Sequence, residues 1–374
     1  MIRNLGDLDG DGLDDFVIAD SYRSGDGTTN NYFGRIEIYY SKGDASFVVS
    51  GSENMEVLGA GISSKTDFNK DGHLDFAYTN AFGEIFIHYG TTEGLTSIPS
   101  YTFVSKDESN QTARTMATGD YNGDGCDDIA VSAPTFNGAG SARGQVYIYF
   151  GRGTECSSND PMDGEAPDVV FEGSANNDRL GRGEIYSVGD INGDGKTDFA
   201  FSTDNKIFIA YGGDSGGVVS NYDLTGFQAL VGRRIGYGNF NGDVYSDLVV
   251  ADNNKVLVYY GGSSGISASA SITINDISPI NYTYPPTITN FARAVSPEMT
   301  DINGDGLSDL IIASDRGLIA YHTNNGAIQD MPSYFDSYIN TTSISLKILM
   351  FGNNIIYCDN TANKGNCNLL KMGE

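Results

Sequence analysis

Six copies of a nine-residue acidic motif are the feature of this sequence that most constrains its fold. Each copy follows the pattern D-x-[DN]-x-D-G-x-x-D with small variations, and the copies start at residues 7, 67, 120, 190, 239 and 301. Successive starts are separated by 60, 53, 70, 49 and 62 residues. A motif that recurs at a period of this size indicates a repeated supersecondary unit whose copies bury their faces against one another.

Each motif precedes two runs that are typical of β-strands. The first run is short and apolar, as in residues 16–19 and 310–312, and the second alternates, as in residues 35–40 and 255–260. Glycine turns follow most of the second runs, and no segment carries the start and stop signals of a helix. One unit therefore contains a strand, the acidic loop, two further strands and a variable fourth strand. Four antiparallel strands repeated radially make a β-propeller, so we expect an all-β propeller over residues 1–374 as a single domain.

The tail predicts one more blade than there are motifs. Residues 345–351 and 355–358 are apolar runs joined by a Gly/Asn turn, which is typical of a hairpin, and residues 368–371 are a candidate third strand. Gly352 lies 51 residues after Asp301, which fits the period. We expect seven blades, six with an acidic loop and a degenerate last blade at about residues 343–372. Six blades are the alternative.

The acidic loops have the composition of calcium sites. Carboxylates at positions 1, 3, 5 and 9 of a tight loop converge on one point, and Ca²⁺ takes about six to eight oxygen ligands. Glycine at position 6 permits the sharp left-handed bend, and the backbone carbonyl at position 7 would supply a further oxygen. An EF-hand needs a glutamate at position 12, where all six copies here are apolar, so that class is excluded.

Six loops therefore give up to six calcium ions, whose role we expect to be structural. The loops span residues 7–15, 67–75, 120–128, 190–198, 239–247 and 301–309. The expected ligands are Asp7, Asp9, Asp11, Leu13, Asp15, Asp67, Asn69, Asp71, His73, Asp75, Asp120, Asn122, Asp124, Cys126, Asp128, Asp190, Asn192, Asp194, Lys196, Asp198, Asn239, Asn241, Asp243, Tyr245, Asp247, Asp301, Asn303, Asp305, Leu307 and Asp309. The fifth loop is the weakest candidate, because Asn239 replaces an acid and Val244 replaces glycine.

This pattern resembles the FG-GAP repeats of integrin α-subunit propellers and their bacterial relatives. The resemblance covers residues 1 to at least 325 and is most specific in the six loops and the third strands. It implies a seven-bladed propeller that holds Ca²⁺ between the first two strands of certain blades, and a role in adhesion or protein binding. The Phe-Gly and Gly-Ala-Pro landmarks of the family are poorly kept, with Ala133 and Pro134 as the best trace.

Composition narrows the partners and the compartment. A net charge of −27 argues against nucleic acid and anionic membranes as partners, and the longest apolar runs are too short to span a bilayer. The first twenty residues show no signal peptide. The four cysteines are even in number, which favours an oxidising compartment. Cys126 with Cys156 and Cys358 with Cys367 are the candidate disulfides, and four free thiols are the alternative.

Three functions remain open on the sequence. The leading one is a secreted or cell-surface, non-catalytic module that binds a protein or cell-surface partner, including further copies of itself. The second is a structural subunit of an extracellular filament, assembled by strand or loop contacts. The third is a calcium-dependent polysaccharide lyase-like enzyme. The chain has only three histidines and no tryptophan, which argues against this third function. Residues 152–180 and 263–290 interrupt the period as either surface decoration or partner-binding loops.

Overall fold

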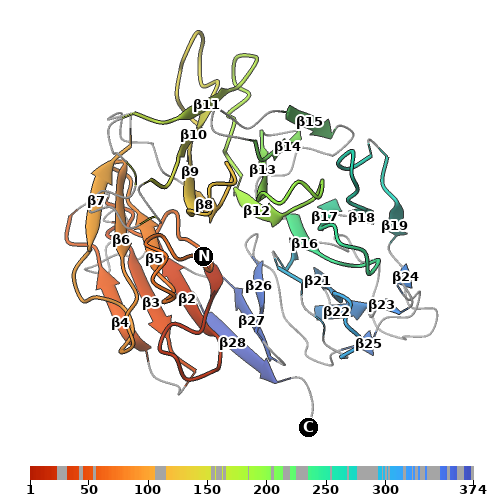
Figure 1. Cartoon of the computed structure of the whole chain (residues 1–374), viewed down its shortest axis with the longest axis horizontal. Helices are drawn as coiled ribbons and strands as arrows, with labels where there is room; N and C mark the ends of the chain where they lie inside the picture. The colour runs from red at the N-terminus through yellow and green to blue at the C-terminus, as the bar shows by residue number, and fades with distance from the viewer. Residues whose placement is uncertain are drawn as a thin grey trace. The chain divides into compact units, whose positions relative to one another are not determined.

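Strands account for all the regular secondary structure of the described residues, which confirms the expected all-β class (Figure 1). The computed structural model describes residues 1–22, 32–41, 45–53, 56–105, 115–152, 156, 162, 166–183, 185–203, 206–213, 220–224, 235–252, 255–267, 269–275, 294–296, 298–299, 301, 304–314, 317–321, 323–324, 327–328, 333–334, 346–351, 354–359 and 366–371. Within these residues the strands form antiparallel meanders, each following the chain order.

Four-stranded sheets recur along the chain and have the strand order of propeller blades. The first joins β1 (Ile2–Gly6), β2 (Asp15–Asp20), β3 (Arg35–Tyr39) and β4 (Ala45–Ser50). The third joins β8 (Met116–Gly119), β9 (Asp128–Ala133), β10 (Gln145–Tyr149) and β11 (Val169–Glu172). The fourth joins β12 (Tyr186–Gly189), β13 (Asp198–Ser202), β14 (Ile207–Tyr211) and β15 (Ser220–Leu224). The fifth joins β16 (Ile235–Gly238), β17 (Asp247–Asp252), β18 (Lys255–Tyr259) and β19 (Ile272–Asn275).

The second sheet keeps only three named strands, β5 (Phe76–Thr79), β6 (Glu84–His88) and β7 (Tyr101–Val104). An irregular segment takes the place of its first strand. Ile62 forms an isolated bridge with Tyr78, and the Ser63 N–H donates to the Ala77 carbonyl at 2.8 Å. The Ala77 N–H donates in turn to the Ser63 hydroxyl at 2.9 Å, so a side chain replaces one rung of the backbone ladder.

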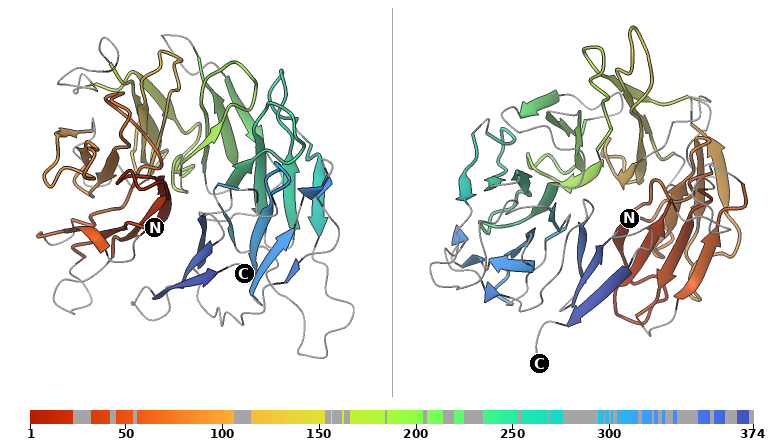
Figure 2. Two further views of the ribbon diagram at one scale, coloured as in Figure 1. Left: turned by 60° about the horizontal axis from the view of Figure 1, so that its bottom comes forward. Right: turned by 180° about the vertical axis from the view of Figure 1, so that it is seen from behind.

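The last two sheets lie in the part of the chain that is hardest to read from sequence. The sixth joins β20 (Ala294–Val295), β21 (Leu310–Ser314), β22 (Gly317–Tyr321) and β25 (Ser333–Tyr334), beside the hairpin of β23 (Thr323–Asn324) and β24 (Ala327–Ile328). The seventh joins β26 (Leu346–Phe351), β27 (Asn354–Asp359) and β28 (Asn366–Lys371), drawn in blue-violet in Figure 2. These three strands confirm the hairpin and third strand predicted for the tail, and their register places Cys358 opposite Cys367.

The apolar core is divided into clusters that each draw on two successive sheets. One joins the first and second sheets through Val17 and Phe76, and another joins the third and fourth through Ile148 and Phe199. Further clusters join the second sheet to the third and the fifth to the sixth. Strands such as β9 are buried along their whole length because both of their faces are covered, which produces a continuous apolar run instead of alternation.

The chain divides into two compact units. The first contains Met1–Ser187 and Gly195–Gly232, and the second contains Val188–Asp194 and Arg233–Glu374. The first unit therefore holds the first three sheets and most of the fourth, while the second holds the fifth, sixth and seventh. The fourth acidic loop is shared, since its residues up to Asp194 belong to the second unit.

Candidate functional site: the acidic loops

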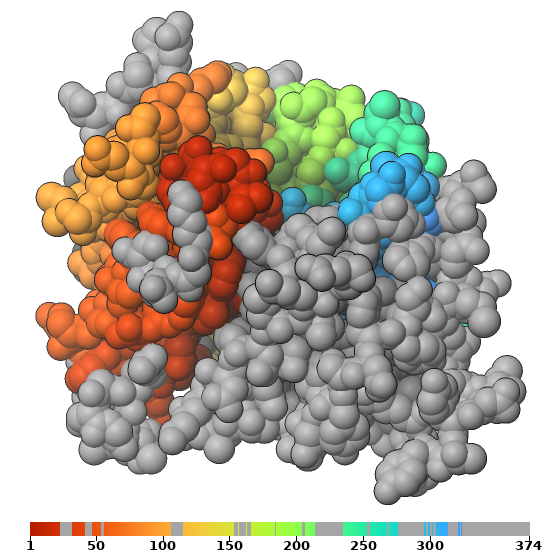
Figure 3. All heavy atoms as spheres, turned by 90° about the horizontal axis from the view of Figure 1, so that it is seen from below, coloured from red at the N-terminus to blue at the C-terminus, as the bar shows by residue number. Residues whose placement is uncertain are grey.

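The acidic loops lie immediately before the predicted apolar strands, which are β2, β5, β9, β13, β17 and β21. In the first loop, carboxylate oxygens of Asp7, Asp9 and Asp15 lie within 4.8 Å of one another. Residues 10 and 12–14 of this loop are exposed, and Figure 3 shows the N-terminal residues in dark red at the surface. The loop is therefore open to solvent on one side while its last aspartate is buried.

The position-1 side chain holds the turn together. In the first, second, third and sixth loops the position-6 N–H donates to its Oδ2 at 2.7–2.9 Å. The position-5 N–H donates to its Oδ1 at 3.0–3.2 Å, and the fourth loop shares this second bond. The loop backbone thus wraps around one carboxylate, which fixes where the other acidic side chains start.

Positions 3 and 5 form a second layer of contacts inside the loop. The position-5 Oδ1 accepts the position-7 N–H at 2.8–2.9 Å in five loops. Where position 3 is asparagine, its amide donates to the position-5 Oδ2 at 2.7–3.0 Å. Asn303, the position-3 residue of the sixth loop, lies outside the described residues. These contacts bring the predicted ligands of each described loop into one short turn.

The position-9 aspartates have a role that the sequence did not reveal. All six are fully buried: Asp15, Asp75, Asp128, Asp198, Asp247 and Asp309. Each accepts an N–H at 2.7–2.9 Å from the residue just after the third strand or one position beyond it, such as Gly90 or Gly151. In four loops the other oxygen accepts the position-2 N–H at 2.7–2.8 Å. This carboxylate therefore ties the acidic loop to the far end of the third strand.

Burial makes these carboxylates reluctant to ionise in the absence of a cation. It raises the pKa of Asp15 and Asp247 to about 6, of Asp75 to about 7 and of Asp128 to about 8. Their N–H partners oppose this effect, while the neighbouring acids of the same loop add to it. A cluster of oxygen ligands that repel one another fits a hard divalent cation, so the donor set of the first loop is suited to Ca²⁺.

Two backbone positions of the acidic loop adopt a positive φ, position 4 in all six loops and position 6 in five, although only position 6 was anticipated. Position 6 has φ between 84° and 87° at Gly12, Gly72, Gly125, Gly195 and Gly306. Position 4 also has a positive φ, from 72° at Gly10 to 80° at Gly123, and Lys70 adopts 55° there in the second loop. The signal was present in the sequence, because five of the six copies carry glycine at position 4.

The fifth loop departs from this geometry. Six described non-glycine residues have a positive φ, and Val244 at position 6 is not among them. The Asn239 amide nitrogen donates to the Asp243 carbonyl at 2.6 Å, where the other loops have an N–H donating to an aspartate. The side chains of Asn241 and Asp243 keep the contacts of the other loops. The anticipated strain at Val244 is therefore avoided by a different backbone course.

Successive loops are joined to one another through position 8. The position-8 N–H donates at 2.8 Å to the position-1 carbonyl of the preceding loop, for Thr197 to Asp120, Ser246 to Asp190 and Ser308 to Asn239. At the third loop the side chain of Asp127 takes over, accepting from the Asp67 N–H at 2.8 Å and the Thr66 hydroxyl at 2.7 Å. The bonds of Thr197, Ser246 and Ser308 use backbone groups only, so the side-chain pattern does not reveal them.

A disulfide confirms the proximity predicted for the third loop. Cys126, at position 7, is bonded to Cys156, and their Cα atoms are 5.4 Å apart. Cys156 follows the third strand of the same sheet, so the bond closes the loop against the turn that also carries Gly151. The third loop is therefore held by both a covalent bond and the Asp128 carboxylate.

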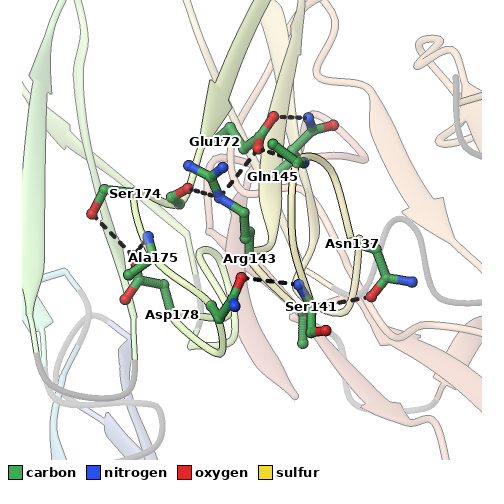
Figure 4. Close-up of polar contacts among 12 residues, drawn as sticks. Asn137, Ser141, Arg143, Gln145, Glu172, Ser174, Ala175 and Asp178 are labelled. Atoms are coloured by element: carbon green, nitrogen blue, oxygen red, sulfur yellow. Dashed lines mark hydrogen bonds and ion pairs between the residues drawn. The ribbon is translucent and has the colours of Figure 1, made fainter.

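The opposite end of the third sheet carries ordered polar loops. Arg143 contacts Glu172 at 3.3 Å, and Gln145 donates to the same carboxylate at 2.9 Å (Figure 4). The Ser141 N–H donates to the side chain of Asn176 at 3.1 Å, which joins residues 134–144 to residues 173–183. The segment that interrupts the period, residues 152–180, therefore supplies the outer strand β11 and part of this network. Most of the second interrupting segment, residues 276–290, lies outside the described residues.

The family match covers the third acidic loop. Residues 112–149 match the FG-GAP repeat family. The chain carries an FG-GAP repeat. This FG-GAP repeat contains β8, the third acidic loop, β9 and β10, so the resemblance seen in the motifs is confirmed. Its geometry recurs in the other loops, which share the buried position-9 aspartate.

Two curated relatives and one solved structure are similar to this chain. Integrin alpha-PS3 of Drosophila melanogaster is 30% identical over 157 residues, which cover 38% of this chain and 13% of that protein. Phosphatidylinositol-glycan-specific phospholipase D of Bos taurus is 25% identical over 216 residues, covering 51% and 24%. The match thus spans a quarter or less of these relatives. A crystal structure of BBS1N in complex with ARL6DN has a TM-score of 0.55 at 13% identity, covering 100% of this chain and 92% of that one, and this likeness concerns the fold alone.

Within the part of the chain that the structure describes, no helix is long and apolar enough to cross a bilayer.

Proposed function

We propose that this chain is a calcium-stabilised, seven-bladed β-propeller that binds a protein partner at the cell surface or outside the cell. The observation that carries the proposal is the FG-GAP repeat, whose central element is an acidic loop that recurs five more times. Relatives of integrin type support protein binding as the activity.

Seven blades are supported by the order of the sheets. Five sheets of four strands and two of three strands follow one another along the described residues. Apolar clusters shared by successive sheets are what a propeller requires, because a blade cannot cover both of its faces alone. The last sheet lacks an acidic loop and supplies the seventh blade.

Calcium is supported by the donor set of the loops. Asp7, Asp9, Asp11 and Asp15 would hold the ion in the first loop, with the carbonyl of Leu13 as a further oxygen. The equivalent residues would do so in the second, third, fourth and sixth loops. A bound Ca²⁺ would supply positive charge that offsets the repulsion among these carboxylates, and so would stabilise the turn.

A role outside the reducing cytosol is supported by the disulfide. Bonds such as Cys126–Cys156 persist in oxidising compartments and are rare in cytosolic proteins. An extracellular setting also suits the acidic loops, because calcium is abundant enough there to fill sites of moderate affinity.

We propose a non-catalytic role, although one relative is an enzyme. The aligned residues cover 24% of the bovine phospholipase D, so its activity does not transfer with the match. Of the histidines, His88 is buried, and burial lowers its pKa while its Nδ1 lies 2.7 Å from the Thr96 carbonyl. This histidine is therefore committed to the packing of the second sheet.

The partner surface we favour is formed by residues 134–144 and 173–183. Strand β9 begins at the third acidic loop and ends at this surface, so the surface lies at the opposite end of the sheet. The backbone bonds of Ser141 and Ala142 hold the loops in place while the Ser141 side chain remains exposed. Ordered loops lose little entropy on binding, which favours affinity.

Cell adhesion tests this function. Cells are expected to attach to surfaces coated with the protein in Ca²⁺, to detach in EDTA and to reattach when calcium is restored. Ser141→Arg should reduce attachment, whereas Ile98→Arg, at an exposed position outside the acidic loops, should leave it unchanged. Absence of attachment by a folded, calcium-loaded protein would refute the adhesion role without affecting the calcium proposal.

Self-association is the second candidate, and the outer strands favour it. Strand β11 ends the order of the third sheet, and Val170 on it is 42% exposed. An unpaired apolar edge accepts a further strand, from another copy or from a different protein. Sedimentation in Ca²⁺ distinguishes self-association from binding of a different protein, because a strict monomer at all concentrations would exclude the filament.

A further inference from the structure

The fifth loop contains a hydrogen bond that needs an asparagine at position 1, because an ionised aspartate cannot donate. The Asn239 Oδ1 accepts the Gly242 N–H at 2.8 Å, and its Nδ2 donates to the Asp243 carbonyl at 2.6 Å. One partner can only donate and the other can only accept, so the orientation of the amide is fixed by its surroundings. The position-1 side chain therefore presents an N–H₂ group where an aspartate would present an oxygen.

The backbone of this loop matches the asparagine. In the first, second, third and sixth loops the position-6 N–H points to the position-1 side chain at 2.7–2.9 Å. In the fifth loop the carbonyl of position 5 points there instead, so the peptide between Asp243 and Val244 is turned over. The turned peptide removes the need for a positive φ at position 6, and Val244 adopts the ordinary sign of φ. The two departures from the motif therefore compensate each other.

This arrangement removes one ligand from the candidate ion site. An amide N–H₂ group donates hydrogen bonds and cannot coordinate a cation through its nitrogen. Asp243 and Asp247 keep the contacts that their counterparts make in the other loops, to the Tyr245 N–H at 2.8 Å and to the Phe240 and Gly261 N–H groups at 2.8 and 2.9 Å. The donor set of the fifth loop therefore departs from the others at position 1, where Asn239 turns its N–H₂ group to the loop backbone.

We infer that the fifth loop closes without a metal ion, and that the bond from Asn239 to the Asp243 carbonyl stabilises it as the cation stabilises the other loops. The comparison with the other loops rests on the calcium binding proposed above, whereas the internal bond does not. The loop would then keep its shape when calcium is removed.

The position of this loop gives the inference a structural consequence. The Ser246 N–H donates to the Asp190 carbonyl at 2.8 Å, and the Ser308 N–H donates to the Asn239 carbonyl at 2.8 Å. The Asn239 N–H donates in return to the Ser308 hydroxyl at 2.9 Å. A metal-free loop is thus hydrogen-bonded to residues of the loops before and after it, and holds both in place when their ions leave.

Counting bound calcium tests the inference directly. Native mass spectrometry of the full chain, with Ca²⁺ alone as the probe, should give five ions for the wild type. Asn239→Asp with Val244→Gly restores the motif and should add one ion. The matched control, Asp301→Asn with Gly306→Val, installs the same two departures in the sixth loop and should remove one. Six ions in the wild type, or no gain in the first double variant, would overturn the inference.

A second measurement does not depend on calcium. In EDTA, Asn239→Asp places a carboxylate oxygen against the Asp243 carbonyl and should lower the melting temperature by about 2 to 5 °C. Val244→Ala keeps the ordinary φ and should leave it unchanged. An Asn239→Asp protein that melts at or above the wild-type temperature in EDTA would refute the metal-free lock. Zero ions in every variant would refute the proposed calcium function, and the EDTA result would still decide the lock.

Discussion

The backbone N–H of Ser246 donates a hydrogen bond to the carbonyl of Asp190 at 2.8 Å, which joins the fifth acidic loop to the fourth. The same bond links Thr197 to Asp120 and Ser308 to Asn239. Because the acceptor belongs to position 1, the bond attaches to the residue around which each loop is wrapped. Neighbouring loops therefore share backbone contacts in addition to the apolar clusters between their sheets.

Replacing Ser246 by proline tests this linkage. Proline removes the donor and restricts the preceding residue, so the free energy of unfolding should fall by about 1 to 3 kcal/mol. Ser246→Ala keeps the N–H and is the matched control, with an expected loss below about 0.5 kcal/mol. Denaturant unfolding measures both, and equal losses for the two variants would show that the backbone bond contributes nothing.

Asp75→Asn should be among the most destabilising isosteric changes in the protein. Asp75 is fully buried and accepts the N–H groups of Phe68 at 2.7 Å and Gly90 at 2.7 Å. An asparagine leaves one of these donors facing an N–H₂ group, which should cost about 1 to 3 kcal/mol in EDTA. The loss should be larger in Ca²⁺, because Asp75 is also a predicted ligand of the ion. Asp14→Asn, at an exposed position of the first loop, is the control and should be close to neutral.

Calcium should change how the stability of the protein depends on pH. Burial raises the pKa of Asp75 to about 7 and of Asp128 to about 8 in the folded protein, from an ordinary value of 3.8. The folded state then holds protons that the unfolded chain has released, so the calcium-free protein should lose stability as pH rises from about 4 to about 8. Calcium needs ionised ligands, and its stabilising effect should grow over the same range.

Melting curves in EDTA and in Ca²⁺ at several pH values within this range measure the effect. The two melting temperatures should converge near pH 5 and separate towards pH 8, by an amount that reflects several loops at once. Curves that stay parallel would mean that the buried aspartates do not take part in calcium binding.

Removing the disulfide should destabilise the third sheet. The bond joins residues 30 apart in sequence, and closing a loop of this size is worth about 3 to 4 kcal/mol in the chain-entropy description. Cys126→Ser with Cys156→Ser should lower the free energy of unfolding by that order. Cys358→Ser with Cys367→Ser is the companion variant, because the register of β27 and β28 predicts a second bond there. Alkylation of the unfolded, unreduced chain should find no free thiol in the wild type.

The fold was predictable because its signals repeat. Six motifs with strand runs behind them defined the sheets, and the tail runs defined β26 to β28 without any motif. The second sheet was less regular than predicted, because the Ser63 hydroxyl replaces a ladder bond, and nothing in a single serine signals this. The ends of the other strands are marked by glycine and asparagine turns, which can be recognised in the sequence itself.

The candidate site was predictable in its residues and less so in their roles. Charge and spacing identify Asp75 as a loop acid, but its burial depends on the turn after the third strand, fifteen residues later at Gly90. The linkage through Ser246 uses backbone atoms and leaves no trace in the side-chain pattern. Val244 was read as strained, whereas the structure resolves the strain by turning one peptide, a choice that depends on Asn239 at the same time.

The bond from each position-9 aspartate to the turn beyond the third strand predicts which residue is still needed in a repeat copy that does not bind metal. A copy that stops binding metal no longer needs acids at positions 1, 3 and 5, but it still needs its last aspartate to hold two segments together. The fifth loop has asparagine at position 1 and the buried Asp247 at position 9. Searches that demand the whole acidic pattern will therefore undercount the copies in related chains, whereas a lone aspartate before an apolar strand, with a turn 14 to 26 residues later, marks a copy without the full pattern.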